Sequence, residues 1–204
     1  GFRNPFRFTV QPGGSTDPAD GDPGVIYLGD VGWKVWEEMN VVRKGENHGW
    51  PCREGARPNN DYQNNGQPAT NGCGTTPTGV ITDPSYEWHH SNGSLSTPSG
   101  LRARAILSGD FISGTRYPAF YRDAIFYADY PYGWIAAARV DGSGELTQQR
   151  VFSSDYGPSG ALVFDPYSEL LHIVSLSDGR IYRLRHVDEA TNSVPVAAAA
   201  ARVL

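Results

Sequence analysis

The side chains best suited to chemistry concentrate in the first fifty residues. Arg3 and Asn4 precede a proline, Glu37 and Glu38 are adjacent in a short apolar run, and His48 lies in a glycine-rich segment. A fixed guanidinium can hold a carboxylate or another anionic oxygen. Carboxylates are hard oxygen ligands that suit cations such as calcium. The simpler interpretation is that Arg3 and Asn4 satisfy turn backbone and that the two glutamates are solvated charges at a strand edge.

Two cysteines, Cys52 and Cys73, bracket a long polar segment that is rich in Asn, Gly and Pro. Such a segment has few apolar anchors, and a disulfide that closes about 20 residues stabilises a fold by about 3 kcal/mol in the chain-entropy model. We therefore expect a Cys52–Cys73 disulfide, with two unrelated thiols as the alternative. Asn92 begins the N-glycosylation sequon Asn92-Gly93-Ser94, which agrees with the same oxidising, extracellular or cell-surface setting.

The composition limits the class of protein. The chain has 204 residues, of which 39% are apolar and 12% aromatic, and it contains 24 glycines and 15 prolines. This balance is typical of a loop-rich β-protein and unlike that of a disordered chain. The net charge is −5 and no long basic run occurs, so we expect no nucleic-acid surface. No stretch of about 18 apolar residues occurs either, so we expect no membrane span.

Short apolar or alternating runs bounded by Gly, Pro or Asp predict about ten strands. We expect these strands at residues 6–10, 25–28, 37–42, 104–107, 124–130, 134–140, 148–152, 161–164, 170–175 and 180–184, with a loop over 43–99. A sandwich, a barrel and a propeller all agree with this strand count. The last three strands follow one another at intervals of about ten residues, which is the cadence of a propeller blade. The sequence therefore predicts an all-β fold that forms about three blades, a partial sector of a propeller.

Several motifs are too distinctive for composition to explain. They are Arg3-Asn4-Pro5-Phe6, Gly29-Asp30-Val31-Gly32, Trp36-Glu37-Glu38-Met39-Asn40 and Gly45-Glu46-Asn47-His48-Gly49-Trp50-Pro51-Cys52. With them, the chain resembles the soluble glucose/sorbosone dehydrogenase family, pyrroloquinoline-quinone (PQQ) sugar dehydrogenases built on a six-bladed β-propeller. The resemblance implies that residues 1–186 form the C-terminal part of such a propeller, with the remaining blades as partners. Residues 187–204 would then be a linker toward a possible following domain.

The resemblance also implies a cofactor site. Arg3 and Asn4 would contact the quinone, and the main-chain carbonyls of Gly32 and Trp33 would bind the calcium beneath it. The geometry of paired strands agrees with this placement, because the start of one antiparallel strand lies beside the end of the next. We therefore expect Arg3 within about 15 Å, or three strand spacings, of the Gly32 carbonyl.

A further structural calcium in the family uses an acidic side chain and a nearby carbonyl, which would match Glu37 or Glu38 and His48. Other parts of the family's site have no match in this chain. The catalytic histidine of these enzymes lies on an earlier blade, and basic residues that would hold the quinone are not evident. The adjacent His89 and His90 follow a tryptophan in the predicted loop, where we expect a surface or substrate-rim role and not that of a catalytic base.

Two functions of different classes follow. In the first, an extracellular dehydrogenase oxidises a sugar hydroxyl by hydride transfer to PQQ over calcium, with a base outside this chain. In the second, the propeller is a non-catalytic module that binds carbohydrate or protein, or has a structural role, in a multidomain surface or matrix protein.

Overall fold

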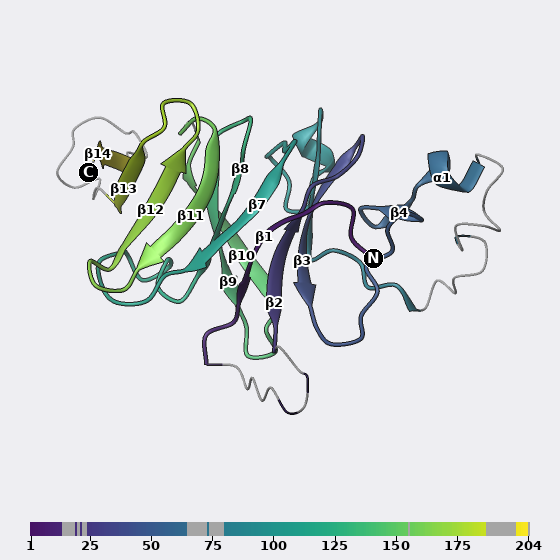
Figure 1. Ribbon diagram of the computed structural model, residues 1–204, viewed down its shortest axis with the longest axis horizontal. Coiled ribbons are helices and arrows are strands. Elements are labelled where there is room, and N and C mark those ends of the chain that lie inside the picture. Colours follow the sequence, from purple (N-terminus) through teal and green to yellow (C-terminus); the bar gives the residue numbers. More distant parts are fainter. Residues whose placement is uncertain are drawn as a thin grey trace. The chain divides into compact units, whose positions relative to one another are not determined.

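The computed structural model describes residues 1–13, 19, 21, 24–64, 73, 80–154, 156–186 and 199–203, and it divides into two compact units, residues 1–106 and 107–204. The described chain contains three four-stranded sheets and one two-stranded sheet (Figure 1). The predicted all-β fold, with the strand content of three propeller blades, is confirmed. Within the described ranges, no helix has the length and apolar character needed to cross a membrane.

The sheet of the first unit places the start of one strand beside the end of the next. Its order is β1 (Pro5–Val10), β2 (Ile26–Asp30), β3 (Trp36–Val42) and β6 (Tyr86–His89). Pro5 pairs with Asp30, and Asp30 pairs with Glu38 in antiparallel register. The beginning of β1, the end of β2 and the beginning of β3 therefore lie together at one edge of the sheet.

The prediction of a continuous loop over residues 43–99 is wrong in its detail. The segment includes β6, the two-residue strands β4 (Arg53–Glu54) and β5 (Arg57–Pro58), the helix α1 (Asn60–Asn64) and the 3₁₀ helix η3 (Gly93–Leu95). Tyr86 and Trp88 on β6 are buried, and β6 pairs with β3, which lies more than forty residues earlier. Because that pairing is non-local and β6 has only four residues, local sequence carries little signal for it.

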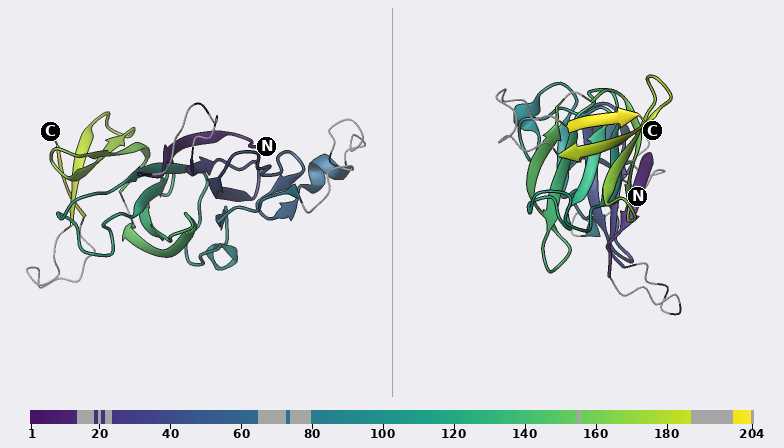
Figure 2. Two further views of the ribbon diagram at one scale, coloured as in Figure 1. Left: turned by 90° about the horizontal axis from the view of Figure 1, so that it is seen from below. Right: turned by 90° about the vertical axis from the view of Figure 1, so that its left-hand side faces the viewer.

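The second unit contains two sheets. The first has the order β10 (Leu146–Ser153), β9 (Ile135–Val140), β8 (Ile125–Asp129) and β7 (Ile106–Phe111), and β7 begins at the boundary between the units. The other has the order β11 (Ser159–Asp165), β12 (Leu170–Ser175), β13 (Ile181–His186) and β14 (Ala199–Val203). The right-hand view of Figure 2 shows β14 antiparallel beside β13. The segment that we expected as a linker therefore contributes a strand at its end.

The core of the second unit contains a cluster of four aromatic rings among aliphatic side chains. Tyr117, Tyr121, Phe126 and Phe152 are buried, and their rings pack against one another with centroids 5.3–6.3 Å apart. Such pairs contribute stability beyond the area that they bury. The Tyr117 hydroxyl also forms hydrogen bonds with one backbone group of β12 and one of β13.

We expect Tyr117→Phe to lower the free energy of unfolding of the second unit by about 2 kcal/mol. The Tyr117 hydroxyl donates to the Leu184 carbonyl at 2.7 Å and accepts from the Leu171 N–H at 2.9 Å. Phenylalanine keeps the ring packing but leaves both buried backbone groups unsatisfied. Urea denaturation measures the effect, and Tyr167→Phe is the matched control because Tyr167 is 97% exposed. Equal stability of the two variants would contradict the role of the hydroxyl.

Candidate functional site

Arg3 and Gly32 lie in direct contact, as the strand geometry predicts. The Arg3 Nη1 atom donates hydrogen bonds to the carbonyls of Val31 at 2.9 Å and Gly32 at 2.8 Å. The buried Asp30 carboxylate accepts from the backbone N–H groups of Arg3 at 2.9 Å and Asn4 at 2.7 Å. Burial raises the pKa of Asp30, and these two N–H groups partly oppose that shift. Asp30 thus fixes the start of β1, while Arg3 holds the loop after β2.

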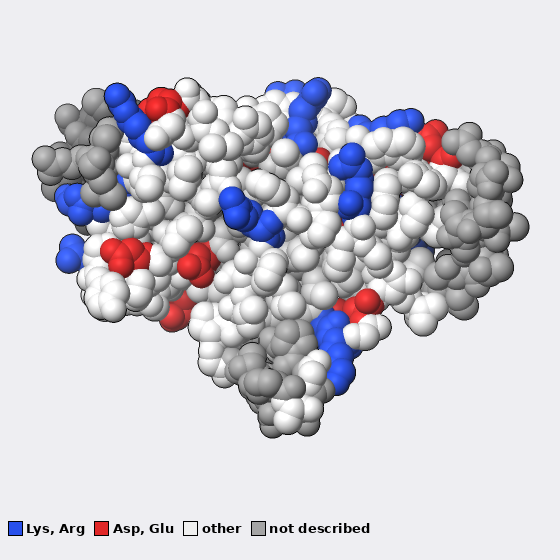
Figure 3. Space-filling model, in the orientation of Figure 1, with Lys and Arg blue, Asp and Glu red and all other residues white. Residues whose placement is uncertain are grey.

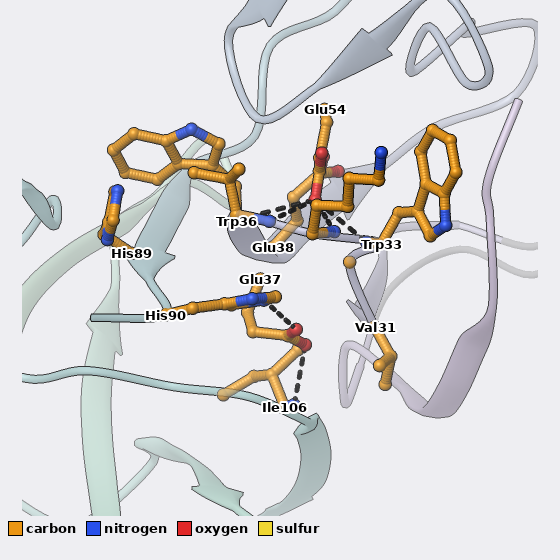
Figure 4. Close-up of polar contacts among 12 residues, drawn as sticks. Val31, Trp33, Trp36, Glu37, Glu38, Glu54, His89, His90 and Ile106 are labelled. Atoms are coloured by element: carbon orange, nitrogen blue, oxygen red, sulfur yellow. Dashed lines mark hydrogen bonds and ion pairs between the residues drawn. The ribbon is translucent and has the colours of Figure 1, made fainter. Parts of the chain in front are cut away.

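The loop after β2 is organised by Glu54. A single oxygen, Glu54 Oε1, accepts from four consecutive backbone N–H groups at 2.7–3.2 Å, those of Trp33, Lys34, Val35 and Trp36. Figure 4 shows these bonds converging on the Glu54 carboxylate. Successive N–H groups that point inward in this way form an anion-binding concavity, which the chain fills with its own carboxylate.

Gly32 is required by the tightness of this turn. A Cβ atom at this position would lie 1.6 Å from the Trp36 carbonyl oxygen, which no side chain can tolerate. The neighbouring Trp33 packs edge-on against Trp50 and Tyr62, with ring centroids 6.1 and 5.3 Å away. The loop that carries the predicted calcium ligands Gly32 and Trp33 is therefore held by Arg3, by Glu54 and by aromatic contacts.

Glu37 and Glu38 do not meet at one site. Consecutive strand residues point to opposite faces of a sheet. Glu37 is fully buried, where its Oε1 lies 2.8 Å from His90 Nε2 and its Oε2 accepts from the Ile106 N–H at 3.1 Å (Figure 4). Glu38 Oε1 instead accepts from the Gly55 N–H at 2.6 Å. The structure thus separates the two glutamates that the sequence places side by side.

Glu38 belongs to a buried polar chain that includes His48. Asn40 donates through Nδ2 to Glu38 Oε2 at 3.1 Å, and Asn40 Oδ1 lies 3.0 Å from His48 Nδ1. Burial raises the pKa of Glu38 to about 7 and lowers that of His48. Of the predicted structural calcium residues, the structure brings Glu38 and His48 into one chain through Asn40 and leaves Glu37 outside it. No group of three or more His, Cys, Asp or Glu side chains suited to a metal occurs among the described residues.

The adjacent histidines have structural partners. His90 is bound to Glu37, and His89 Nδ1 accepts from the backbone N–H groups of Ser91 and Asn92 at 3.0 and 3.1 Å. The His89 ring also packs edge-on against Trp36, with centroids 4.9 Å apart. These contacts use both side chains to hold β3 and the turn after β6.

The predicted disulfide is confirmed: Cys52 and Cys73 are bonded, with an S–S distance of 2.08 Å. It ties residue 73 to the start of the β4–β5 hairpin that carries Glu54. The sequon residue Asn92 is exposed and caps η3, because its Oδ1 accepts from the Ser94 N–H at 3.1 Å. Glycosylation at Asn92 stays a prediction.

Sequence reasoning missed Glu54, which lies two positions beyond Cys52, the last residue of a motif that it did single out. Nothing in the local pattern shows that this carboxylate reaches back some twenty residues to the loop after β2. Two features together could have indicated it. A glycine-containing turn leaves successive N–H groups in need of an acceptor, and an acidic residue lies on a disulfide-anchored hairpin.

No known protein-family profile matches the sequence. Among solved structures, the chain is similar to the soluble aldose sugar dehydrogenase of Escherichia coli in its apo form, with 19% identity, a TM-score of 0.52 and coverage of 91% of this chain and 42% of that one. A glucose dehydrogenase matches with 22% identity, a TM-score of 0.50 and the same coverages. The PQQ-bound aldose sugar dehydrogenase of Streptomyces coelicolor matches with 16% identity and a TM-score of 0.49, over 100% of this chain and 42% of that one.

This chain spans about two fifths of the length of the solved structures that it matches. At these identities the likeness concerns the fold. The three four-stranded sheets thus have the fold of a partial sector of the β-propeller found in soluble aldose sugar and glucose dehydrogenases.

Proposed function

We propose that this chain forms part of an extracellular, PQQ-dependent aldose sugar dehydrogenase, and that it supplies one wall of the quinone and calcium site. The observation that carries this proposal is the contact between Arg3 and the Gly32 carbonyl. Two motifs that resemble the dehydrogenase family, 29 residues apart, meet in one hydrogen bond. The remaining blades of the propeller would supply the catalytic base and the other cofactor contacts.

The donor set fits an anionic quinone beside a cation. Arg3 uses Nη1 for both bonds to the loop, and both Arg3 and its sequence neighbour Asn4 are exposed. The carbonyls of Gly32 and Trp33 are hard oxygen ligands of the kind that calcium takes. A calcium ion at the Gly32 carbonyl would be repelled by the Arg3 guanidinium that donates to the same carbonyl, so the negative charge of the quinone would be needed to offset the two cations. PQQ, when bound there, supplies the acceptor for two electrons and a proton removed from the sugar as a hydride equivalent.

Several features support the proposed setting. A structural disulfide such as Cys52–Cys73 is typical of oxidising compartments, which supports secretion or a cell-surface location. On the face drawn in Figure 3, Lys and Arg side chains are scattered among uncharged and acidic residues.

One observation favours the second candidate, a propeller that binds carbohydrate or protein without catalysis or has only a structural role. Glu37 and His90 form a buried pair with each other, and Glu38 and His48 are joined through Asn40. These acidic and histidine side chains therefore have structural partners in the described part of the first unit. Such a module would keep the fold and the loop after β2 without needing the quinone.

We expect Arg3→Ala to weaken PQQ binding by about 10- to 100-fold, the equivalent of one charge-assisted hydrogen bond. The experiment uses the full-length protein that carries this chain, titrated with PQQ in the presence of calcium and followed by its absorption spectrum. Arg102→Ala is the control, because Arg102 is an exposed arginine of the same unit. Sugar-dependent reduction of an artificial electron acceptor then tests for dehydrogenase activity.

Saturable PQQ binding that depends on calcium and on Arg3, together with sugar oxidation, supports the dehydrogenase. Full-length protein that is folded but binds no PQQ in the presence of calcium overturns this proposal and favours the non-catalytic module. Equal PQQ affinity of the Arg3→Ala and Arg102→Ala variants would remove Arg3 from the site.

A further inference from the structure

The Arg3 side chain is an exposed cation on a fixed piece of backbone. The Asp30 carboxylate accepts from the backbone N–H groups of Arg3 at 2.9 Å and Asn4 at 2.7 Å, which holds the start of β1 in place. The guanidinium extends from this anchor and lies over the Trp50 ring, with 6.0 Å between Cζ and the ring centroid. Exposed side chains change rotamer within nanoseconds, so the guanidinium can exchange partners while the backbone stays where it is.

The partners of this guanidinium are oxygen atoms of the kind that a metal cation takes. Arg3 Nη1 donates to the Val31 carbonyl at 2.9 Å and to the Gly32 carbonyl at 2.8 Å. The Gly32 carbonyl is also one of the two main-chain ligands that we propose for calcium. Arg3 and a calcium ion therefore have one acceptor in common at this edge of the sheet.

Two cations at one carbonyl oxygen weaken each other's binding. A calcium ion on the Gly32 oxygen would lie no more than about 5.4 Å from Arg3 Nη1, because calcium binds oxygen at about 2.3–2.6 Å and Nη1 is 2.8 Å from the same atom. Near a protein surface the effective dielectric constant is about 20, so charges at this separation repel each other far more strongly than in water. The contact of Arg3 with Gly32 therefore opposes calcium binding.

We propose that Arg3 competes with calcium for the Gly32 carbonyl, and that the quinone relieves this competition. A guanidinium binds an anionic oxygen more strongly than a neutral carbonyl, often through two parallel bonds. An anionic quinone therefore draws Arg3 away from Gly32 and leaves the carbonyl to calcium. Arg3 thus makes the binding of the two ligands cooperative. This inference rests on the proposed function, because it concerns the regulation of that same quinone and calcium site.

The competition gives the two ligands effects of opposite sign when Arg3 is removed. If Arg3 is only a contact of the quinone, Arg3→Ala weakens PQQ binding and leaves the affinity for calcium alone unchanged. If Arg3 also competes for the Gly32 carbonyl, Arg3→Ala tightens calcium binding in the absence of PQQ. By linkage, PQQ raises calcium affinity by the same factor as calcium raises PQQ affinity, and removal of Arg3 lowers this shared factor.

The first measurement is the calcium affinity of the full-length protein that carries this chain, without PQQ. Terbium is the probe, because it takes the same hard oxygen ligands as calcium and emits when a nearby indole such as that of Trp33 is excited. Calcium then displaces the terbium. We expect Arg3→Ala to bind calcium at least about fivefold more tightly than the unmodified protein. Arg102→Ala is the matched control, because it removes the same charge from another exposed arginine of the unit.

Two further variants identify the site and the role of the charge. Trp33→Phe keeps a ring against Trp50 and Tyr62 but removes the indole, so terbium emission that falls in this variant comes from the loop after β2. Arg3→Lys keeps the positive charge and loses the planar fork, so we expect its calcium affinity to lie between those of the unmodified protein and Arg3→Ala. A loss of loop structure in Arg3→Ala would weaken calcium binding and would not give this order.

The second measurement repeats the calcium titration with saturating PQQ. We expect PQQ to raise the calcium affinity of the unmodified protein at least about tenfold, and that of Arg3→Ala by a factor at least about fivefold smaller. An equal effect of PQQ with and without Arg3 would overturn the inference.

The outcomes separate this inference from the proposed function. Calcium affinity that is equal or weaker in folded Arg3→Ala overturns the inference, and calcium-dependent PQQ binding by the unmodified protein would then leave the proposed function standing. Tighter calcium binding in Arg3→Ala, combined with no PQQ binding by the unmodified protein, rejects the proposed dehydrogenase and supports the competition between Arg3 and calcium. The absence of calcium and terbium binding in every variant overturns both.

Discussion

Glu54→Ala is expected to lower the free energy of unfolding of the first unit by about 3–5 kcal/mol. Four buried or half-buried backbone N–H groups, those of residues 33–36, share Glu54 Oε1 as their acceptor. Hydrogen bonds to a charged group are worth about 1.5–3 kcal/mol each, but four bonds to one oxygen are not additive. Alanine leaves all four donors without this acceptor, and the loop has no local alternative to it.

Two variants separate charge from geometry in this effect. Glu54→Gln keeps an acceptor oxygen but removes its charge, so we expect about half of the loss seen with alanine. Glu46→Ala is the control, because the Glu46 carboxylate accepts from a single backbone N–H, that of Arg43, at 2.7 Å, while its Oε2 lies 3.6 Å from His48 Nε2. Urea denaturation followed by tryptophan fluorescence compares the three variants. A loss in Glu54→Ala no larger than in Glu46→Ala would contradict the organising role of Glu54.

The same substitution reports on the proposed cofactor site. Glu54 does not touch the predicted quinone contacts, but it holds the loop whose Gly32 and Trp33 carbonyls would bind calcium. We therefore expect Glu54→Gln to weaken calcium-dependent PQQ binding while Glu46→Ala leaves it unchanged. Weakened stability with unchanged PQQ affinity would confine Glu54 to a structural role.

The contrast between Arg3 and Glu54 shows what the sequence can predict. The contact of Arg3 with Gly32 follows from two adjacent strands, since antiparallel pairing alone places the start of β1 beside the end of β2. The contact of Glu54 with the loop depends on where the disulfide-anchored β4–β5 hairpin folds back. The periodicity of apolar residues in the sequence does not indicate this position. The pairing of His90 with Glu37 spans 53 residues, and the local sequence pattern does not predict it either.

The same distinction holds for the fold. Strands that pair with a sequence neighbour, such as β8 with β9 and β11 with β12, were predicted close to their observed bounds. β6 was missed because its partner β3 lies far away in sequence and because only Tyr86 and Trp88 mark its buried face. The sequence left open whether Glu37 or Glu38 would join His48, and the two-residue repeat of a strand directs these two side chains to opposite faces, with Glu38 on the side of Asn40 and His48.

The stability of the first unit is expected to fall as pH rises, through the ionisation of Glu38. Burial raises the pKa of this carboxyl from 4.5 to about 7, with a smaller contribution from the facing carboxylates of Asp30 and Glu54. The folded state therefore binds more protons than the unfolded state between these values. The contribution of Glu38 to this stability is greatest below pH about 4.5, declines as pH rises through about 7, and falls by about 3 kcal/mol in total.

Glu38→Gln should abolish this pH dependence. Glutamine keeps an acceptor for the Gly55 N–H but carries no charge, and a turned Asn40 amide can accept from it while donating to His48 Nδ1. We expect the variant to be more stable than the unmodified protein by about 2–3 kcal/mol at pH 8 and equally stable at pH 4.5. Urea denaturation of both proteins at both pH values, in the presence of EDTA, measures the difference in their free energies of unfolding. The titration of all other groups is common to the two proteins and cancels in this difference. A variant that is less stable at pH 8, or a difference that does not change with pH, would show that Glu38 is ionised and stabilising in the folded protein.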